Sequence, residues 1–589
     1  MSLASHPMVT LGRNFWIVAG GAVMLGGCVA TVSPISAVAL VGVGSWFGWI
    51  AWDTRRRMPG ISLVNQSSER VGSGDLAGAR RLLDSVDVNR MNRATRRAFE
   101  LNRATLALLA GDAKGSVAHA TLAIDGKTQL FTKTHEQAQI ANALAHRAVS
   151  YAVLGEREMA RADAETVRVH AGVMPSALAR ATLADAIVLA ATGRRDSLRD
   201  LVTAHGRLLR DYLLPRERVL ARSLARLARA DKTTVYREPG KSGEAVDPVA
   251  EWASATAEHA DSEVWAPLPT TERAMYEAQQ VRERMQRHVP KKSRVGATLL
   301  LWVLLIVIFL VIWSFLQPSS GGPPAESMPE RASLFAGMIV GPLLVGLVAL
   351  STWRGSRRGT KQTMAFRQAA LAEARGHREQ ARAAHEALAA ARAPLAVADL
   401  ELAKLADEEG RFKDALELSE RGLGKIATLM ARALAHDVLA PALSAERSFC
   451  LSMLGRTDEA NAELATLVNH PNYPASSVAQ LRVRLAQALF SNDRKAAFVI
   501  ARRRGPNMPI NGRDEMVCDL LDATEGGGVD PIEWARLDAD LNDDAELLAY
   551  VNRLLPGVRA RLVPRARITE ALEPEEADEP NAEETTARV

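Results

Sequence analysis

The chain has 589 residues, of which 48% are hydrophobic and 24% charged, and its formal net charge is +5. These values exclude wholesale disorder and collagen-like structure, and the length requires several structural units rather than one core. Aromatic residues make up only 5% of the chain, while Ala, Leu and Arg are abundant, so we expect an all-α fold. Three cysteines without a CxxC pair argue against a disulfide framework or a zinc site.

Two apolar regions predict transmembrane helical hairpins. After an N-terminal segment of residues 1–14, residues 15–52 contain no Asp, Glu, Lys or Arg. This stretch is too long for one crossing of a hydrocarbon core about 30 Å thick. Pro34 interrupts it, so we expect two spans joined by a turn. Residues 297–353 hold a second pair of apolar stretches around a loop rich in Pro, Gly and Ser, which brings the expected crossings to four.

Basic residues flank both hairpins on the same side of the membrane. Arg13 precedes the first hairpin, and basic clusters lie at residues 55–57, 291–294 and 354–361. Because Lys and Arg next to a span are retained in the cytoplasm, both large soluble regions are expected there. Together with the preference for Arg and Ala, this pattern predicts a multi-pass protein of a bacterial inner membrane.

The segment Leu25-Gly26-Gly27-Cys28 offers an alternative for the first hairpin, because it is similar to a bacterial lipoprotein cleavage box. Lipidation of Cys28 would then replace the first span. The chain after Cys28 would begin with another apolar run and a triple-arginine stop, which suits a membrane span better.

A short turn recurs in both soluble regions, with a small residue usually five positions later. Gly or Asn in the turn can adopt the left-handed conformation that ends one helix, and the small residue lets the next helix approach closely. Each recurrence therefore predicts a helix–turn–helix unit. The turns are expected at Gly74, Gly111, Gly155 and Gly193 in the first region and at Gly376, Gly410, Gly455 and Asn492 in the second.

The best of these units resembles the tetratricopeptide repeat, or TPR. The segment Glu409-Gly410-Arg411-Phe412-Lys413-Asp414-Ala415-Leu416 resembles the turn and second-helix opening of that family, and the segment from Leu454 to Ala460 is close to it. Most other units lack the family's large aromatic residues, and the turns lie 34 to 45 residues apart, against a usual 34. The resemblance implies two α-solenoid arrays, over residues 61–235 and 362–562, with concave surfaces suited to peptides or helices.

The two halves repeat the same order of elements. The turn spacings are 37, 44 and 38 residues in the first half and 34, 45 and 37 in the second. A segment starting Val246-Asp247-Pro248 recurs as Val529-Asp530-Pro531, and each copy carries a tryptophan a few residues later. We therefore expect a tandem duplication, in which each half is a membrane hairpin, four helical hairpins and a closing helix that begins at Asp-Pro. The first closing helix lies with a linker in residues 236–294, and the second ends the second array.

The acidic residues 563–589 predict a disordered tail, because a segment dense in Glu, Pro and Ala cannot bury an apolar face. The tail would promote solubility or attract a basic partner.

Four arginines form the candidate contact site. Arg218, Arg222, Arg226 and Arg229 fall on one face of a helix predicted over residues 215–230. The face is either solvated, with arginine stems covering apolar surface, or a contact for anionic lipid headgroups or an acidic partner. His377 and His385 lie eight positions apart beside arginines and are expected to be solvated rather than metal ligands.

The sequence contains no local motif of a catalytic, cofactor-binding or metal site, so no enzyme activity is expected. Nucleic acid is a poor candidate partner, because the net charge is low and no aromatic platform accompanies the arginines. The architecture favours a membrane-anchored scaffold for cytoplasmic proteins or peptides, with self-association as a further expectation. The alternative is an accessory component of a membrane transport or secretion complex.

Overall fold

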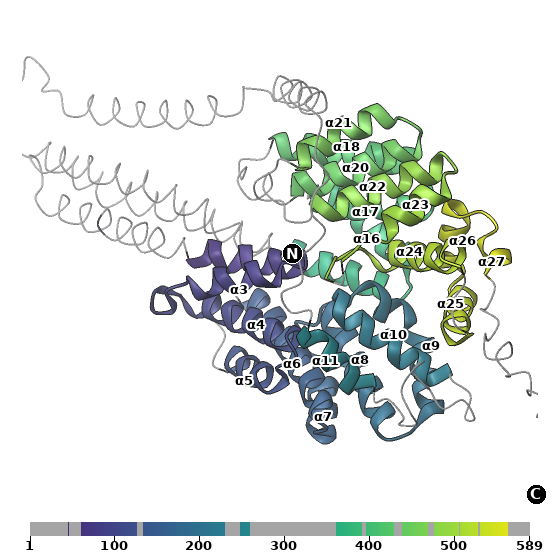
Figure 1. Cartoon of the computed structure of the whole chain (residues 1–589). Helices are drawn as coiled ribbons and strands as arrows, with labels where there is room; N and C mark the ends of the chain where they lie inside the picture. The colour runs from purple at the N-terminus through teal and green to yellow at the C-terminus, as the bar shows by residue number, and fades with distance from the viewer. Residues whose placement is uncertain are drawn as a thin grey trace, which may run out of the picture.

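The computed structural model describes residues 45, 60–125, 133–229, 248–258, 361–391, 396–428, 439–468, 476–505, 507–527 and 531–562. Throughout these ranges the regular structure is helical, without a strand (Figure 1). Apart from Ser45, both predicted membrane hairpins lie outside them, as do the N-terminal segment and the acidic tail. No helix within the described ranges has the length and apolar character needed to cross a bilayer.

The first half is a row of helices in which each packs on the next. The described part of this row begins with a helix at residues 60–72. A short 3-10 helix (Val88–Arg90) follows the second helix of the row. The named helices are α3 (Leu76–Asp84), α4 (Arg93–Leu109), α5 (Ala113–Ile124), α6 (Lys133–Val153), α7 (Arg157–Val169), α8 (Pro175–Ala191), α9 (Arg195–Asp211), α10 (Pro215–Arg229) and α11 (Pro248–Glu258). Helix α6 also packs on α4 and α8, and α8 on α10, which is the neighbour pattern of helical repeats.

The second half is also a row of packed helices. It begins with a helix at residues 361–374 and ends at Leu562. Its named helices are α16 (Arg378–Ala390), α17 (Ala396–Glu408), α18 (Phe412–Thr428), α20 (Ala440–Met453), α21 (Thr457–Val468), α22 (Ser476–Phe490), α23 (Arg494–Ala501), α24 (Gly512–Glu525), α25 (Pro531–Asp543), α26 (Ala545–Leu554) and α27 (Val558–Arg561). Helix α20 packs on α18 and α21, and also on the more distant helices α17 and α22. This is the same pattern of contacts as in the first half.

The eight predicted turns are confirmed. Each of the seven glycines has a positive φ, between 68° and 84°, and Asn492 has a φ of 55°. Within the described ranges Asn492 is the one residue other than glycine with a positive φ. The residues five positions after the turns are all fully buried; they are Ala79, Ser116, Ala160, Leu198, Ala381, Ala415, Ala460 and Ala497. Seven of these residues are small and so let the two helices of their hairpin approach closely, while the eighth is Leu198.

The two closing helices also begin where the Asp-Pro segments predict, at Pro248 and Pro531. Proline suits the first turn of a helix because its missing N–H would have no partner there. Trp252 of α11 is buried and donates from Nε1 to the carbonyl of Arg216 on α10, at 2.7 Å. Helix α11 thus closes its own half.

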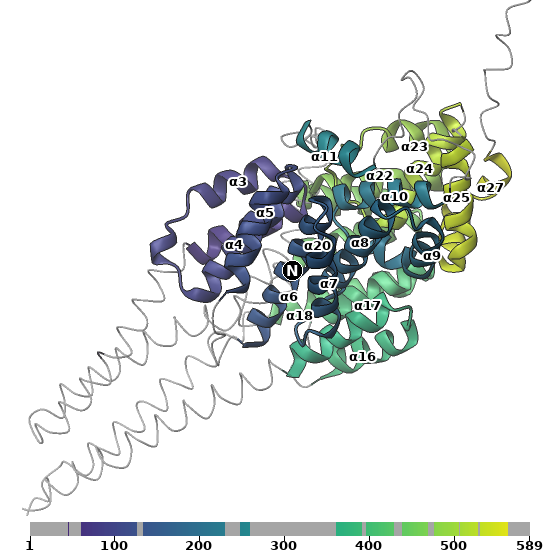
Figure 2. The same ribbon diagram turned by 90° about the horizontal axis from the view of Figure 1, so that it is seen from below.

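The two halves lie against each other rather than apart. In both views α9 and α10 of the first half lie beside α24 and α25 of the second (Figures 1 and 2), and α10 packs on α25 as well as on α11. Leu371 and Ala374, from the first helix of the second half, join an apolar cluster of the first half. The contact between the halves is otherwise rich in charge.

Candidate functional site

The four predicted arginines of α10 face the second half of the chain. Arg218 Nε lies 3.2 Å from a carboxylate oxygen of Glu515. Arg222 reaches both Glu515 and Asp519, at 3.1 Å each. Arginines of α10 therefore face carboxylates of α24 across the boundary between the halves.

The remaining two arginines continue the pattern along α25. Arg226 Nε donates to Glu533 Oε2 at 2.6 Å. Arg229 donates to Asp540 at 2.8 Å and to Asp543 at 3.1 Å. Spacings of four, four and three residues on α10 thus match carboxylates on two helices of the other half.

The interpretation of this face as a solvated outer surface is wrong. Arg218 is 4% exposed, and the side chains of Arg222 and Arg226 are 26% and 32% exposed. The periodicity that places the arginines on one face is correct, but periodicity does not identify what covers that face. The acidic partner observed is the second half of the same chain, while contact with lipid headgroups or another protein stays a prediction.

Asp519 is the most connected carboxylate at this boundary. Its oxygens lie 3.1 Å from Arg222, 2.7 Å from Arg504 and 3.1 Å from Arg536. Burial alone would raise its pKa, but these three guanidinium groups hold the pKa of Asp519 well below its usual range. Asp519 therefore stays ionised and joins the two halves by charge-assisted hydrogen bonds.

Arg536 supports the acidic side from within. Its side chain is 2% exposed and binds Glu533 at 2.6 Å, Asp540 at 2.9 Å and Asp519 at 3.1 Å. We call the whole network the charged seam; its members are Arg218, Arg222, Arg226, Arg229, Arg504 and Arg536 with Glu515, Asp519, Asp522, Glu533, Asp540 and Asp543. Six arginines meet six carboxylates, so the formal charges cancel.

A loop of the second half adds side-chain and backbone contacts beside the seam. Arg216 Nε donates to Asn507 Oδ1, and its Nη1 donates to the carbonyl of Leu109, both at 2.5 Å. Arg218 Nη2 donates to the carbonyl of Ile510 at 2.6 Å. At Gly74 a Cβ would overlap the carbonyl oxygen of Asn507, so the first repeat turn lets the two backbones meet.

A second charged contact lies where α9 meets α26. Glu546 accepts from Arg207 of the first half at 3.2 Å and from Arg378 of the second at 2.8 Å. Next to it, Arg210 donates to Asp544 at 2.8 Å. The boundary between the halves is therefore charged along more than one pair of helices.

One carboxyl group at this contact titrates near neutrality. Burial, followed by repulsion from Glu401 and Glu408, raises the pKa of Glu373 to about 7. Arg207 opposes this rise but does not cancel it. Glu373 lies on the first helix of the second half and acts on Tyr212 of the first, where burial and then Glu373 raise the pKa of the phenol.

The second half also buries a charged cluster that the sequence did not reveal. Arg482 on α22 pairs with Asp407, with Glu446 at 2.7 Å and with Asp514 at 2.9 Å. Its guanidinium lies 3.7 Å from the ring centre of Phe449. These groups come from helices α17, α20, α22 and α24, so no local pattern marks them.

The histidine and cysteine side chains divide between surface and core. His377 is exposed as predicted, but His385 is fully buried and makes an edge contact with Phe366, so its predicted solvation is wrong. His385 follows Ala381 by four residues and precedes Leu388 by three, a stripe that could have placed it in the core. Burial raises the pKa of Cys518 to about 12, which keeps this thiol protonated and unreactive.

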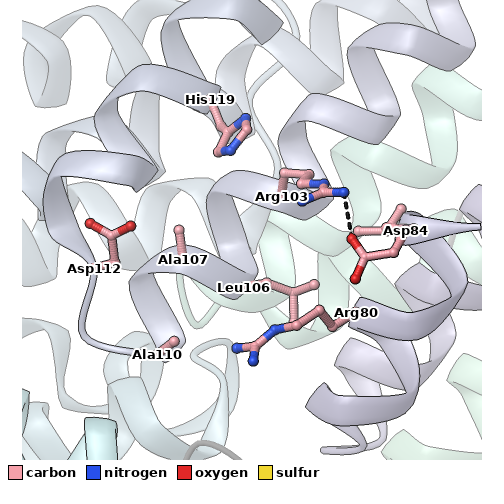
Figure 3. Close-up of a pocket in the computed structure, with 9 residues that line it drawn as sticks. Arg80, Asp84, Arg103, Leu106, Ala107, Ala110, Asp112 and His119 are labelled. Carbon is pink, nitrogen blue, oxygen red and sulfur yellow. Dashed lines mark hydrogen bonds and ion pairs between the residues drawn. The ribbon is translucent and has the colours of Figure 1, made fainter. Parts of the chain in front are cut away.

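A surface hollow of about 350 Å³ lies between α3, α4 and α5 (Figure 3). Its lining combines apolar residues, such as Leu106 and Ala107, with charged residues of both signs, such as Arg103 and Asp84. In this lining Arg103 donates to Asp84 at 2.6 Å, and His119 Nδ1 lies 2.8 Å from Glu100 beside it. The hollow can accept a side chain that is apolar in its body and polar at its end.

The described ranges hold no group of three or more His, Cys, Asp or Glu side chains arranged for a metal ion. Comparison with known proteins gives no matching family model, no matching curated protein and no matching solved structure.

Proposed function

We propose that the chain is a membrane-anchored scaffold that holds cytoplasmic proteins or peptides beneath a bacterial-type inner membrane. The hairpins expected at residues 15–52 and 297–353 tether two TPR-like α-solenoid arrays that arose by tandem duplication. Eight repetitions of the left-handed turn, seven of them followed by a small buried residue, support this part of the proposal.

The observation that carries the proposal is the hollow between α3, α4 and α5. A volume of about 350 Å³ is in the range of sites that bind small ligands or anchor side chains of peptides. The apolar lining residues provide affinity, while Arg103 and Asp84 provide polar partners of either sign. This arrangement is better suited to binding a peptide side chain than to catalysing a reaction.

The charged seam supports the same function in another way. Because it joins the two arrays, their surfaces keep a constant relative position before any partner arrives. A preformed surface loses less conformational freedom on binding than two independent arrays would. Partners held on both arrays would then be brought together at the membrane.

The test fills the hollow without changing charge. Ala107 lines it, so Ala107→Phe places a ring in the space where a partner side chain would sit. The tagged full-length chain is purified from membranes in mild detergent, and proteins that accompany it are identified by mass spectrometry. We expect them to be lost from the Ala107→Phe chain.

The matched control is Ala162→Phe, at an exposed position of α7 outside the hollow, which should leave recovery unchanged. Equal recovery from both variants would assign the contact to another surface. Recovery of the chain alone from wild-type membranes would refute the scaffold. Recovery of integral transport or secretion proteins by every variant would favour the alternative, an accessory role in such a complex.

A further inference from the structure

Helices α10 and α24 hold equivalent places in the two halves. The segment Pro215-Arg216-Glu217-Arg218 opens α10, and Gly512-Arg513-Asp514-Glu515 opens α24, 297 positions later. In each half the acid at the third position binds an arginine of the helix two before it. Arg180 Nε lies 2.6 Å from Glu217, and Arg482 Nε lies 2.9 Å from Asp514.

This register pairs two arginines of the seam with their own counterparts. Arg218 is the counterpart of Glu515, and it binds Glu515 at 3.2 Å. Arg222 is the counterpart of Asp519, and it binds Asp519 at 3.1 Å. Residues that touch their own counterparts lie next to a twofold axis, as in the self-complementary contact of a symmetric dimer.

Away from this axis the two sides match only near the end of α9, because α25 packs on α10 of the other half whereas its counterpart α11 packs on α10 of its own half. In the same register Arg216 corresponds to Arg513, and Arg210 corresponds to Asn507. Arg216 binds Asn507. On the other side the start of α24 meets Arg210, because a Cβ on Gly512 would overlap the Arg210 side chain.

We propose that α10 and α24 pair about a local twofold axis, as the same helix in two copies of one unit would, and that the closing helices α11 and α25 depart from it. Opposite charges at equivalent positions, Arg218 against Glu515 and Arg222 against Asp519, determine that a first half pairs with a second half and not with another first half. The inference concerns pairing of the halves and does not depend on the proposed scaffold function.

The physical reason is that a twofold axis places identical residues face to face. Two α10 helices would bring arginine against arginine, and two α24 helices would bring carboxylate against carboxylate. Apolar surface provides little discrimination here, because a single apolar cluster of the described ranges crosses the boundary, through Leu371 and Ala374. The charge pattern therefore selects the partner.

The experiment reverses each side and then both. The variants are R218E/R222E in the first half, E515R/D519R in the second, and the four substitutions together, all in the full-length chain in detergent. Amide hydrogen exchange is followed in α10 and α24, with far-UV circular dichroism to verify that helix content is retained.

Each one-sided reversal should speed exchange in both helices by roughly tenfold, because the halves separate locally. The fourfold variant should recover protection relative to either one-sided variant, even though Asp519 also serves Arg504 and Arg536 within its own half. The control R456E reverses an exposed charge that pairs with Glu459 away from the seam, and it should leave exchange in α10 unchanged. Wild-type protection in both one-sided variants, or a fourfold variant no better than either, would overturn the proposal.

A second measurement tests whether charge, rather than the connection between the halves, selects the partner. The two one-sided variants are co-expressed with different tags. In each variant alone, the first half repels the second half of the same chain. In the mixture, the first half of either variant carries charges opposite to those of the second half of the other. The two variants should therefore copurify as a reciprocal dimer. Wild-type chains with the same two tags should not copurify to that extent, and absence of the mixed dimer would refute selection by charge.

Discussion

The two halves use the same succession of helical hairpins but fill their interiors differently. In the first half the apolar residues form two clusters, of which the larger extends from Leu108 on α4 to Trp252 on α11. In the second half the apolar residues form several smaller clusters, and Arg482 lies on α22 between Leu481 and Val483, which belong to two of them. Both halves bury charge, since the first half buries the pair of Arg97 with Glu136, but in the second half a buried arginine lies between two apolar clusters.

Buried charge makes the second half dependent on complete pairing. Arg482 faces three carboxylates, whereas Arg180 at the corresponding place in the first half faces Glu217. Burial raises the pKa of Asp407 well above its usual range, although Arg482 opposes the rise. The charged groups are satisfied only while the arginine is present.

The largest expected effect therefore comes from Arg482→Met. Removal of the guanidinium leaves three carboxylates with reduced compensation, and we expect a loss of about 3–5 kcal/mol in the free energy of unfolding. Arg180→Met should cost less, since Glu217 still accepts from the Leu214 amide at 2.9 Å. Calorimetric unfolding of the two variants measures the difference, and equal losses would contradict the idea that the halves differ in this respect.

Gly74→Ala and Gly155→Ala separate the cost of a turn from the cost of the contact between the halves. Both glycines have a φ of 81°, so alanine costs about 1 kcal/mol at either position. At Gly74 the new Cβ also overlaps the Asn507 carbonyl, while at Gly155 it meets nothing. We expect Gly74→Ala to lower the free energy of unfolding by roughly 1–3 kcal/mol more than Gly155→Ala does. Thermal unfolding measures the difference, and equal shifts of the two midpoints would contradict a close contact at Gly74.

The contact at Glu373 should make stability depend on pH. The pKa of this carboxyl is raised from 4.5 to about 7 in the folded chain, so the folded state binds the proton more tightly than the unfolded state. The resulting stabilisation is fully present below pH 4.5 and is lost as the pH rises through 7. As the pH rises, the thermal midpoint of the wild type should fall more than that of Glu373→Gln. Parallel curves of midpoint against pH would contradict this role of Glu373.

The smallest effect is expected at an exposed pair. Arg456 binds Glu459 at 2.7 Å, and their side chains are 44% and 51% exposed. Solvent screens such a pair, so Arg456→Ala should change stability by less than about 0.5 kcal/mol. A loss comparable to that of Arg482→Met would show that burial is not what distinguishes the two arginines.

The repeat turns were predictable because their causes are local. A left-handed backbone conformation favours Gly or Asn, and a close approach of two helices favours a small side chain. Gly410 with Ala415, and Asn492 with Ala497, therefore predict turns without any tertiary information. Pro531 similarly marks the start of α25. The exact packing of that helix was not predictable, because α25 leaves its own half to pack on α10.

The candidate site divides in the same way. Spacing along α10 predicts that Arg218, Arg222, Arg226 and Arg229 share a face, and they do. Their partners lie about 300 positions later in the sequence, and no local pattern links α10 to those carboxylates. The hollow between α3, α4 and α5 was missed for a related reason, since it exists only once three helices are packed together.

The amino-acid sequence by itself determined the helices, their eight turns and the small buried residues after them, because backbone conformation and side-chain volume act within a few positions. Only the tertiary structure decided that the arginine face of α10 is covered by α24 and α25, and that Arg482 is buried among three carboxylates. Those outcomes depend on which distant helices meet, and a charge pattern on one helix is compatible with water, a membrane or another helix until its partner is in place.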